Sequence, residues 1–182
     1  KCFCMNKKVL IISSSPRKNG NSDLLCDEYL KGALEAGHKA KKISLVDKKI
    51  KYCKACDVCQ KGKPCVIDDD MEKILQKMID ADVIVLATPV YFYTMSAQLK
   101  TLIDRTYARY TEITDKEFYF ILTAADEEEK NMKRAIESLR AFTFCLTGAK
   151  EKEIICASGV WKKGDVKDGK YLKMAFNAGL NA

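Results

Sequence analysis

The chain has 182 residues, of which 47% are hydrophobic and 31% charged, with only 9 glycines and 3 prolines. This composition is typical of one folded domain and excludes a disordered, collagenous or low-complexity chain. The length excludes two ordinary domains. The net charge is +7, but no nucleic-acid-binding motif accompanies the dispersed lysines, so we expect no nucleic-acid partner.

The sequence shows no targeting or membrane-spanning segment. No apolar run approaches the roughly 20 residues that a membrane-spanning helix needs. Residues 1–8 lack the apolar core and cleavage site of a signal peptide. We therefore expect a cytoplasmic protein without a membrane partner, and we give Cys2 and Cys4, which precede Met5, little functional weight.

Apolar runs alternate with helical patterns along the whole chain. The patterns predict buried strands at residues 9–12, 40–45, 83–87, 118–122 and 153–156, and helices at about 22–36, 68–79, 96–107, 129–146 and 167–180. Asn21 or Ser22 is the expected N-cap of the first helix, and Gly37 follows its end.

Five β-α units in succession require right-handed crossovers and a parallel sheet with helices on both faces. We therefore predict a single α/β domain over residues 1–182, a flavodoxin-like three-layer sandwich with a five-stranded parallel sheet in the order 2-1-3-4-5. In this fold a ligand binds outside the carboxyl ends of the strands, between strands 1 and 3.

The loop after the first strand has the composition of a phosphate site. Residues 13–22 supply hydroxyl groups, an arginine, Gly20 for an unusual backbone angle, and a helix N-terminus that favours an anion. The loop lacks the Lys-Ser/Thr pair of a nucleotide P-loop and the Gly-x-Gly-x-x-Gly fingerprint of dinucleotide sites. A monophosphate such as that of FMN fits better; the alternative is a polar turn.

The loop after the third strand is rich in aromatic residues. Residues 89–93, Pro-Val-Tyr-Phe-Tyr, lie at the predicted switch point, where backbone groups and aromatic faces would suit a flavin ring. The alternative is a core or interface segment. In the following helix, Lys100 and Asp104 stand one turn apart, which favours a structural ion pair or a subunit contact.

Four of the nine cysteines form one compact run, Cys53-x2-Cys56-x2-Cys59-x5-Cys65, inside a loop at about 47–67. Cytosolic thiols stay reduced, so this clustering indicates metal or redox chemistry. Three thiols at this spacing favour an iron-sulfur cluster; zinc and metal-free thiols are the alternatives. Because the run follows the second strand, we place it at the same sheet edge as the two flavin loops, so cluster and flavin would exchange electrons within one subunit or across a dimer.

The remaining candidates are interpreted as structural. Cys26, Cys145 and Cys156 fall inside apolar patterns and are expected in the core. His38, the single histidine, has no partner motif, which argues against zinc-hydrolase and Ser-His-Asp chemistry. Lysines gather just before the cysteines and predict an ordinary solvated face or a docking surface for an acidic partner; they are Lys39, Lys41, Lys42, Lys48, Lys49, Lys51 and Lys54.

Three ordered motifs, at residues 14–22, 53–71 and 89–105, together resemble the iron-sulfur flavoproteins of the NADPH-dependent FMN reductase branch of the flavodoxin-like superfamily. The resemblance covers roughly residues 8–106. It implies an FMN phosphate on Ser15, Arg17, Asn21 and Ser22, a flavin ring on Pro89, Val90, Tyr91, Phe92 and Tyr93, and a 4Fe-4S cluster on Cys53, Cys56, Cys59 and Cys65. It also implies a homodimer or tetramer and acceptors such as oxygen or peroxide.

The chain departs from that pattern in two places. Residues 123–127, Thr-Ala-Ala-Asp-Glu, replace the glycine-containing loop by which relatives often approach the flavin, and the C-terminal part matches poorly. We expect an FMN-dependent oxidoreductase that passes electrons between an iron-sulfur cluster and FMN, with no catalytic acid or base, and with NAD(P)H or a ferredoxin-like carrier as partner.

Two alternatives from the sequence stay open. One is an NAD(P)H-dependent FMN, quinone or nitro-compound reductase without a working cluster. The other is a zinc-bound, non-enzymatic module for binding or thiol sensing.

Overall fold

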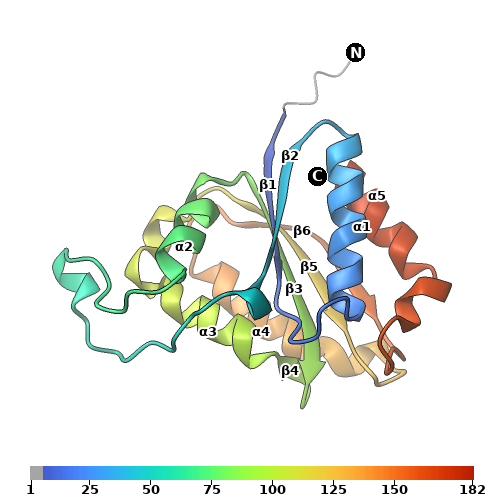
Figure 1. Ribbon diagram of the computed structural model, residues 1–182. Coiled ribbons are helices and arrows are strands. Elements are labelled where there is room, and N and C mark those ends of the chain that lie inside the picture. The colour runs from blue at the N-terminus through green and yellow to red at the C-terminus, as the bar shows by residue number, and fades with distance from the viewer. Residues whose placement is uncertain (1–5) are drawn as a thin grey trace.

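A twisted parallel sheet forms the middle layer of the computed structural model, which describes residues 6–182 (Figure 1). Cys2, Cys4 and Met5 lie outside the described residues. The parallel strands follow the order β2-β1-β3-β5-β6, as the alternation predicts. They are β1 (Lys8–Ser13), β2 (Lys39–Ser44), β3 (Val83–Tyr91), β5 (Glu117–Thr123) and β6 (Lys150–Ala157).

The sheet has one more strand than the five predicted. β4 (Thr94–Met95) pairs antiparallel with the end of β3, through the partners Val90 with Met95 and Tyr91 with Thr94. A strand of two residues is too short to show periodicity, so the sequence pattern could not reveal it.

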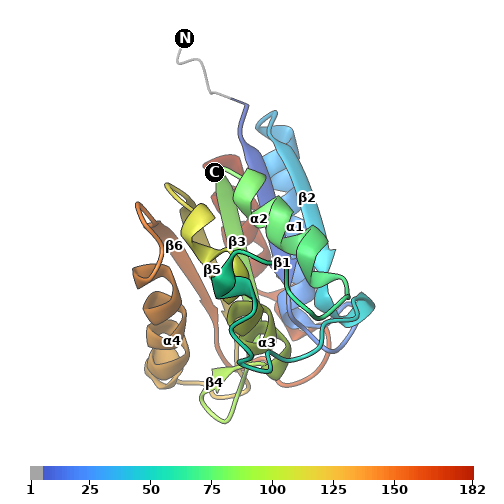
Figure 2. The same ribbon diagram turned by 90° about the vertical axis from the view of Figure 1, so that its left-hand side faces the viewer.

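The alternating side chains of the central strands separate two hydrophobic cores. Leu10 and Ile12 pack with the core under α2 (Met71–Asp80), α3 (Ala97–Arg105) and α4 (Lys133–Phe144). Val9 and Ile11 pack with the core under α1 (Asn21–Glu35) and α5 (Tyr171–Leu180). These three layers are seen edge-on in Figure 1 and, from the α2 side, in Figure 2. Burial on both faces explains the continuous apolar runs.

Short 3-10 turns fill the connections between these elements. They are η1 (Leu45–Asp47), η2 (Cys59–Lys61), η3 (Thr106–Ala108), η4 (Tyr110–Glu112), η5 (Glu129–Met132) and η6 (Asp165–Asp168). The predicted helices at 129–146 and 167–180 therefore begin as irregular turns. In the described part of the chain, no helix is both long enough and apolar enough to cross a membrane.

Three local predictions are wrong. Gly20, not Asn21 or Ser22, is the N-cap of α1, and its φ of −71° is ordinary, so no unusual backbone angle explains this glycine. Cys145 is exposed, because it follows the last residue of α4 and turns away from the core. Cys26 and Cys156 are buried as expected, and His38, which was interpreted as structural, is buried too. Gly37 follows the end of α1 as expected and has a positive φ of 86°.

The cysteine segment, residues 48–70, projects from the body of the molecule between η1 and α2 (Figure 1). It lies on the side of the sheet that carries α2, α3 and α4 (Figure 2).

Candidate functional site

The loop between β1 and α1, residues 14–20, is fixed by a buried carboxylate in the first turn of α1. Asp23 accepts hydrogen bonds from Ser13 Oγ at 2.7 Å, from the Asn19 backbone N–H at 3.0 Å and from Lys42 Nζ at 3.0 Å. Burial by itself raises the pKa of the Asp23 carboxyl, but the hydrogen bonds from Ser13 and Lys42 outweigh it and hold the pKa below its usual value. Asp23 therefore remains charged and anchors the loop.

Buried hydroxyl groups join this loop to the loop after β3. Ser14 Oγ donates to the Ala87 carbonyl at 2.8 Å, and Ser96 Oγ donates to Ser14 Oγ at 2.9 Å. The Ser96 backbone N–H donates to Thr88 Oγ1 at 2.9 Å. The two loops that the sequence assigns to one ligand are thus parts of one hydrogen-bonded unit.

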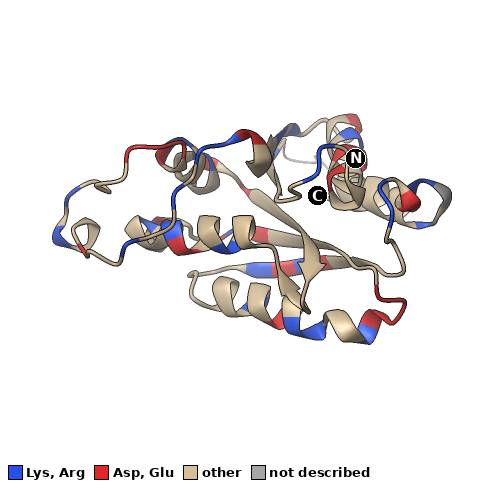
Figure 3. Cartoon of the chain, turned by 60° about the horizontal axis from the view of Figure 1, so that its bottom comes forward, with Lys and Arg blue, Asp and Glu red and all other residues tan. Residues whose placement is uncertain are grey.

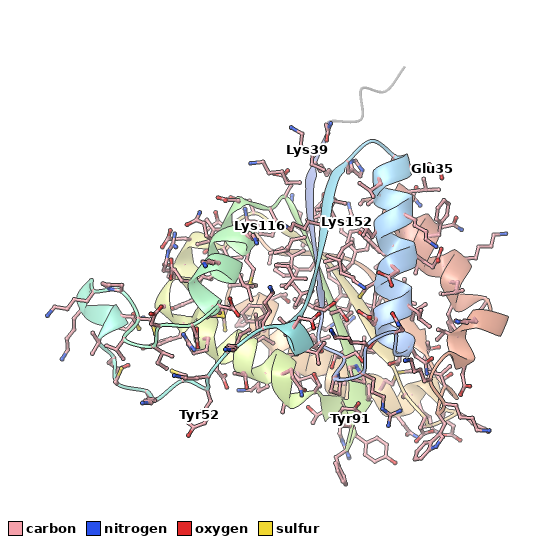
Figure 4. All side chains as sticks on the ribbon, viewed as in Figure 1. Glu35, Lys39, Tyr52, Tyr91, Lys116 and Lys152 are labelled. Carbon is pink, nitrogen blue, oxygen red and sulfur yellow. The ribbon has the colours of Figure 1, made fainter. Side chains whose placement is uncertain are left out.

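A cavity of about 210 Å³ opens at the carboxyl ends of the strands. Figure 4 places Tyr91 at this end of the sheet, opposite the end where Glu35 and Lys39 lie. Seven of the nine residues predicted to hold a flavin line the cavity, from two loops far apart in sequence. They are Ser15, Arg17, Asn21, Ser22, Pro89, Val90 and Tyr91.

The chemistry of this cavity fits an anion with several oxygen atoms. Ser22 is 1% exposed, and its Oγ has no hydrogen-bond partner in the described part of the chain. No described carboxylate pairs with the guanidinium of Arg17, which lines the same cavity. The first backbone N–H groups of α1 add unpaired donors and the positive end of the helix dipole. A phosphate would satisfy all three groups.

Ser15 and Gly20 shape the loop from within. Ser15 Oγ donates to the Arg17 carbonyl at 2.9 Å and accepts from the Arg17 backbone N–H at 3.1 Å. A Cβ atom on Gly20 would lie 2.8 Å from Ser15 Oγ and 3.0 Å from the Arg17 carbonyl oxygen. Gly20 is therefore required for space, and the positive φ in this loop belongs to Asn19, at 55°.

The side chain of Asn21 is engaged by the protein. Its Nδ2 donates to the carbonyls of Val160 at 3.2 Å and Lys162 at 2.9 Å, and its Oδ1 accepts from the Gly164 backbone N–H at 2.8 Å. Asn21 lines the cavity, while its amide faces the loop after β6.

Two further loops contribute residues to the cavity: the loop at 123–127, which the sequence marks only as a departure from its relatives, and the loop after β6, which sequence reasoning missed. Thr123 ends β5 and Ala125 follows it, and Val160, Trp161 and Lys163 follow β6; all five line the cavity. Strand register brings both loops to this end of the sheet, because Pro89 pairs with Thr123, and Thr123 with Ala157. The loop at 123–127, which replaces the glycine-containing loop of relatives, therefore contributes to the cavity. Strand order was the signal that could have located this loop and the loop after β6.

Phe92 and Tyr93 lie outside this cavity. They form the tip of the β3–β4 hairpin with positive φ values of 48° and 61°, and Phe92 is 100% exposed. Both line an adjacent groove of about 260 Å³. The groove shares Val90 and Ala125 with the first cavity, so the two hollows lie next to each other.

The four clustered thiols share one segment. Cys53 and Cys56 are exposed, Cys59 and Cys65 are half-buried, and all four are free. Their number and softness fit an iron-sulfur or zinc centre. In the conformation described for residues 6–182, however, no group of three or more His, Cys, Asp or Glu side chains is arranged to hold a metal ion.

Arg105 closes the base of the cysteine segment. The guanidinium is 4% exposed and donates to the Lys51 carbonyl at 2.6 Å and to Asp69 at 2.7 Å and 3.1 Å, with Cys65 Sγ at 3.7 Å. Burial alone would raise the pKa of the Asp69 carboxyl, but the hydrogen bonds from Arg105 and the neighbouring backbone lower it below the usual value. The pair holds residues 51 and 69 together.

A second groove, of about 780 Å³, lies between the cysteine segment and the ends of α3 and α4. Cys53 and Cys145 line it, together with Tyr107 and Tyr110, whose rings stack at 6.3 Å. None of its lining residues lines the 210 Å³ cavity. Nearby, Lys100 and Asp104 form the ion pair expected from their spacing.

Charge is distributed over the molecule. Figure 3 shows Lys and Arg along the cysteine segment and the helices, with Asp and Glu between them. Lys42, one of the seven clustered lysines, turns inward to Asp23 and Asp27.

A family model described as NADPH-dependent FMN reductase matches residues 7–150. Curated relatives match over a shorter region. An iron-sulfur flavoprotein of Methanocaldococcus jannaschii is 48% identical over 99 residues, which cover 54% of this chain and 51% of the relative. One from Methanosarcina thermophila is 41% identical over 99 residues, covering 54% and 52%. The chain thus matches about half the length of these relatives.

Solved structures share the fold along nearly the whole chain. An NAD(P)H:quinone oxidoreductase from Methanothermobacter marburgensis has a TM-score of 0.74 at 18% identity, covering 97% of this chain and 98% of that chain. A flavone reductase has a TM-score of 0.72 at 22% identity, covering 96% and 61%. These likenesses confirm the flavodoxin-like architecture.

Proposed function

Because this chain belongs to the NADPH-dependent FMN reductase family, we propose that it is an FMN-dependent oxidoreductase whose 210 Å³ cavity holds the FMN phosphate. The observation that carries this proposal is the buried hydroxyl of Ser22, which has no partner among the described residues and lines the same cavity as Arg17. Leaving a buried hydroxyl without a partner costs about 1–3 kcal/mol, so such a group indicates a ligand.

The phosphate would be held by Arg17, Ser22 and the first backbone N–H groups of α1, with Ser15 shaping the loop around it. The cavity is smaller than the roughly 300–1,000 Å³ of a complete ligand site. We therefore place the flavin ring across Val90 and Ala125, into the adjacent groove of about 260 Å³. There Tyr91, Phe92 and Tyr93 would flank the ring, as the sequence predicts.

When bound, FMN supplies the transfer of one or two electrons, and an iron-sulfur cluster supplies single electrons. The role of the chain is to bind, orient and shield such groups. No side chain need serve as acid or base. The family supports NAD(P)H as an electron donor.

The finer proposal adds a 4Fe-4S cluster on Cys53, Cys56, Cys59 and Cys65. Its support is the four-thiol donor set in one segment and the printed names of the iron-sulfur flavoprotein relatives. Loading would require the exposed thiols to converge, and the segment is irregular enough for this, since Ala55, Asp57 and Gly62 already have positive φ. A ferredoxin-like carrier would then be the partner, and a homodimer or tetramer the assembly.

A second function rests on the FMN reductase family alone. It is an NAD(P)H-dependent FMN, quinone or nitro-compound reductase that works without a cluster. Rapid bleaching of bound flavin by NADPH in metal-free protein would support it, whereas bleaching only by a reduced ferredoxin in iron-loaded protein would exclude it.

The phosphate site is tested by comparing FMN with riboflavin, which lacks the phosphate. Arg17→Ala removes a charge-assisted contact, which is typically worth about 1.5–3 kcal/mol. We expect the dissociation constant for FMN to rise about tenfold to hundredfold and that for riboflavin to stay unchanged, as measured by flavin-fluorescence titration of the apoprotein. Equal affinity of the variant and wild type for FMN would place the phosphate elsewhere.

A further inference from the structure

We propose that the loop after β6, residues 158–164, forms the closing wall of the phosphate site, with Lys163 as a second phosphate contact and Asn21 as the positioning residue for this loop. The inference rests on the proposed FMN function. It goes further by assigning selectivity for the phosphorylated flavin to a segment outside residues 7–150, the region that the family model matches.

The loop is tied down on both sides. On the β5 side, the backbone N–H groups of Gly159 and Val160 donate to the carbonyls of Asp126 at 2.8 Å and Ala124 at 2.9 Å. On the α1 side, three hydrogen bonds of Asn21 fasten Val160, Lys162 and Gly164. A segment without helix or strand is thereby held in one conformation against the cavity.

This attachment decides which side chains reach the site. Trp161 and Lys163 line the cavity, whereas Lys162, between them, does not. Val160 lines the cavity as well, and Asn21 holds the backbone carbonyls of Val160 and Lys162 toward α1. The loop thus presents one lysine to the cavity and keeps the other outside it.

The charges match a phosphate monoester. Neither Arg17 nor Lys163 has an ion-pair partner among the described side chains, although both line one cavity. Two nearby carboxylates are already engaged: Asp23 with Lys42, and Asp165 with the Lys162 backbone N–H at 2.6 Å. A phosphate monoester carries about −1.5 to −2 charges at neutral pH. Two cations therefore fit it better than Arg17 alone.

The test uses Trp161, the single tryptophan of the chain, as a built-in reporter. Apoprotein is titrated with FMN and with riboflavin while tryptophan and flavin fluorescence are followed. The variants are Lys163→Ala, its neighbour Lys162→Ala as a matched control, and Asn21→Ala. Circular dichroism confirms that each variant is folded.

We expect Lys163→Ala to weaken FMN about tenfold, to leave riboflavin unchanged and to reduce the salt dependence of FMN binding. Lys162→Ala should match wild type. Asn21→Ala should weaken FMN and also speed tryptic cleavage of the apoprotein after Lys162 and Lys163, because the loop loses its attachment to α1.

Two results would overturn the inference. One is a Lys163→Ala variant that binds FMN as tightly as wild type, or that loses FMN and riboflavin affinity equally. The other is an Asn21→Ala variant that loses FMN while tryptic cleavage of this loop in the apoprotein is unchanged, since Asn21 would then contact the ligand itself. Wild-type protein that binds neither flavin would instead refute the proposed function as well.

Discussion

Single residues show how the site depends on space as much as on chemistry. Gly20 was expected to provide an unusual backbone angle, yet its φ is ordinary, and the absence of a side chain is what the loop requires. The sequence alone does not show which atoms surround a glycine, so it could not reveal that Gly20 is needed for space.

Gly20→Ala should therefore weaken FMN binding. The added Cβ would lie 2.8 Å from Ser15 Oγ and would displace the turn that aims Arg17. We expect a loss of about 1–3 kcal/mol in FMN affinity, the usual range for overpacking a tight site, measured by flavin-fluorescence titration. Gly169→Ala is the matched control, because its nearest contact is an ordinary 3.6 Å. Unchanged FMN affinity in Gly20→Ala would contradict this account of the loop.

Asn21 and Cys145 mark the limit of local prediction. Asn21 was assigned to the phosphate from its place in the motif, but its amide bonds reach residues 139 and 141 positions away. Cys145 was placed in the core by an apolar pattern that continues past the end of α4. The direction of the Asn21 amide and the exposure of Cys145 both depend on how distant segments pack, and a local sequence pattern carries no information about that packing.

At the scale of elements, the start of α1 and the end of β1 are joined by the charge of Asp23. Its pKa is lowered in the folded protein, so the stability it contributes is complete above its unfolded value, near 3.8, and is lost as the pH falls through the lower folded value. The attachment of the phosphate loop should therefore weaken in acid.

Asp23→Asn tests this dependence. Near pH 6 we expect the variant to be less stable than wild type by about 1–3 kcal/mol, since hydrogen bonds to a charged group are replaced. Toward pH 3 the difference should shrink, because wild type is then partly protonated. Urea denaturation at both pH values gives the two free energies of unfolding. Asp104→Asn, which alters an exposed pair, is the control, and a difference independent of pH would contradict the prediction.

The cysteine segment depends on the Arg105–Asp69 pair at its base. Arg105→Met leaves the Asp69 carboxylate buried and unpaired, which typically costs about 3–5 kcal/mol. We expect lower stability in urea and faster tryptic cleavage within residues 48–70. Arg105→Lys keeps the charge but not the planar fork of the guanidinium. Its stability and its rate of tryptic cleavage should therefore lie between those of wild type and Arg105→Met. If the free energy of unfolding of Arg105→Met lay within about 0.5 kcal/mol of that of wild type, the Arg105–Asp69 pair would not hold the base of the segment.

For the whole molecule, the alternation of strands and helices was sufficient to predict the layers and the order of the parallel strands. Continuous apolar runs such as Val83–Ala87 are informative because burial on both faces demands them. The walls of the site at Thr123, Trp161 and Lys163 lacked a motif, and only the pairing of β3, β5 and β6 brings them to Arg17.

The central claim is that this chain binds FMN at the cavity between β1 and β3. The most direct measurement is the content of FMN, iron, sulfide and zinc per chain in protein purified without oxygen. We predict one FMN per chain, with about four irons and four sulfides if the cysteine run is loaded. FMN without iron would support the FMN site and would favour the alternative function, a reductase without a cluster. Protein that contains no flavin and retains none when FMN is added would contradict the claim.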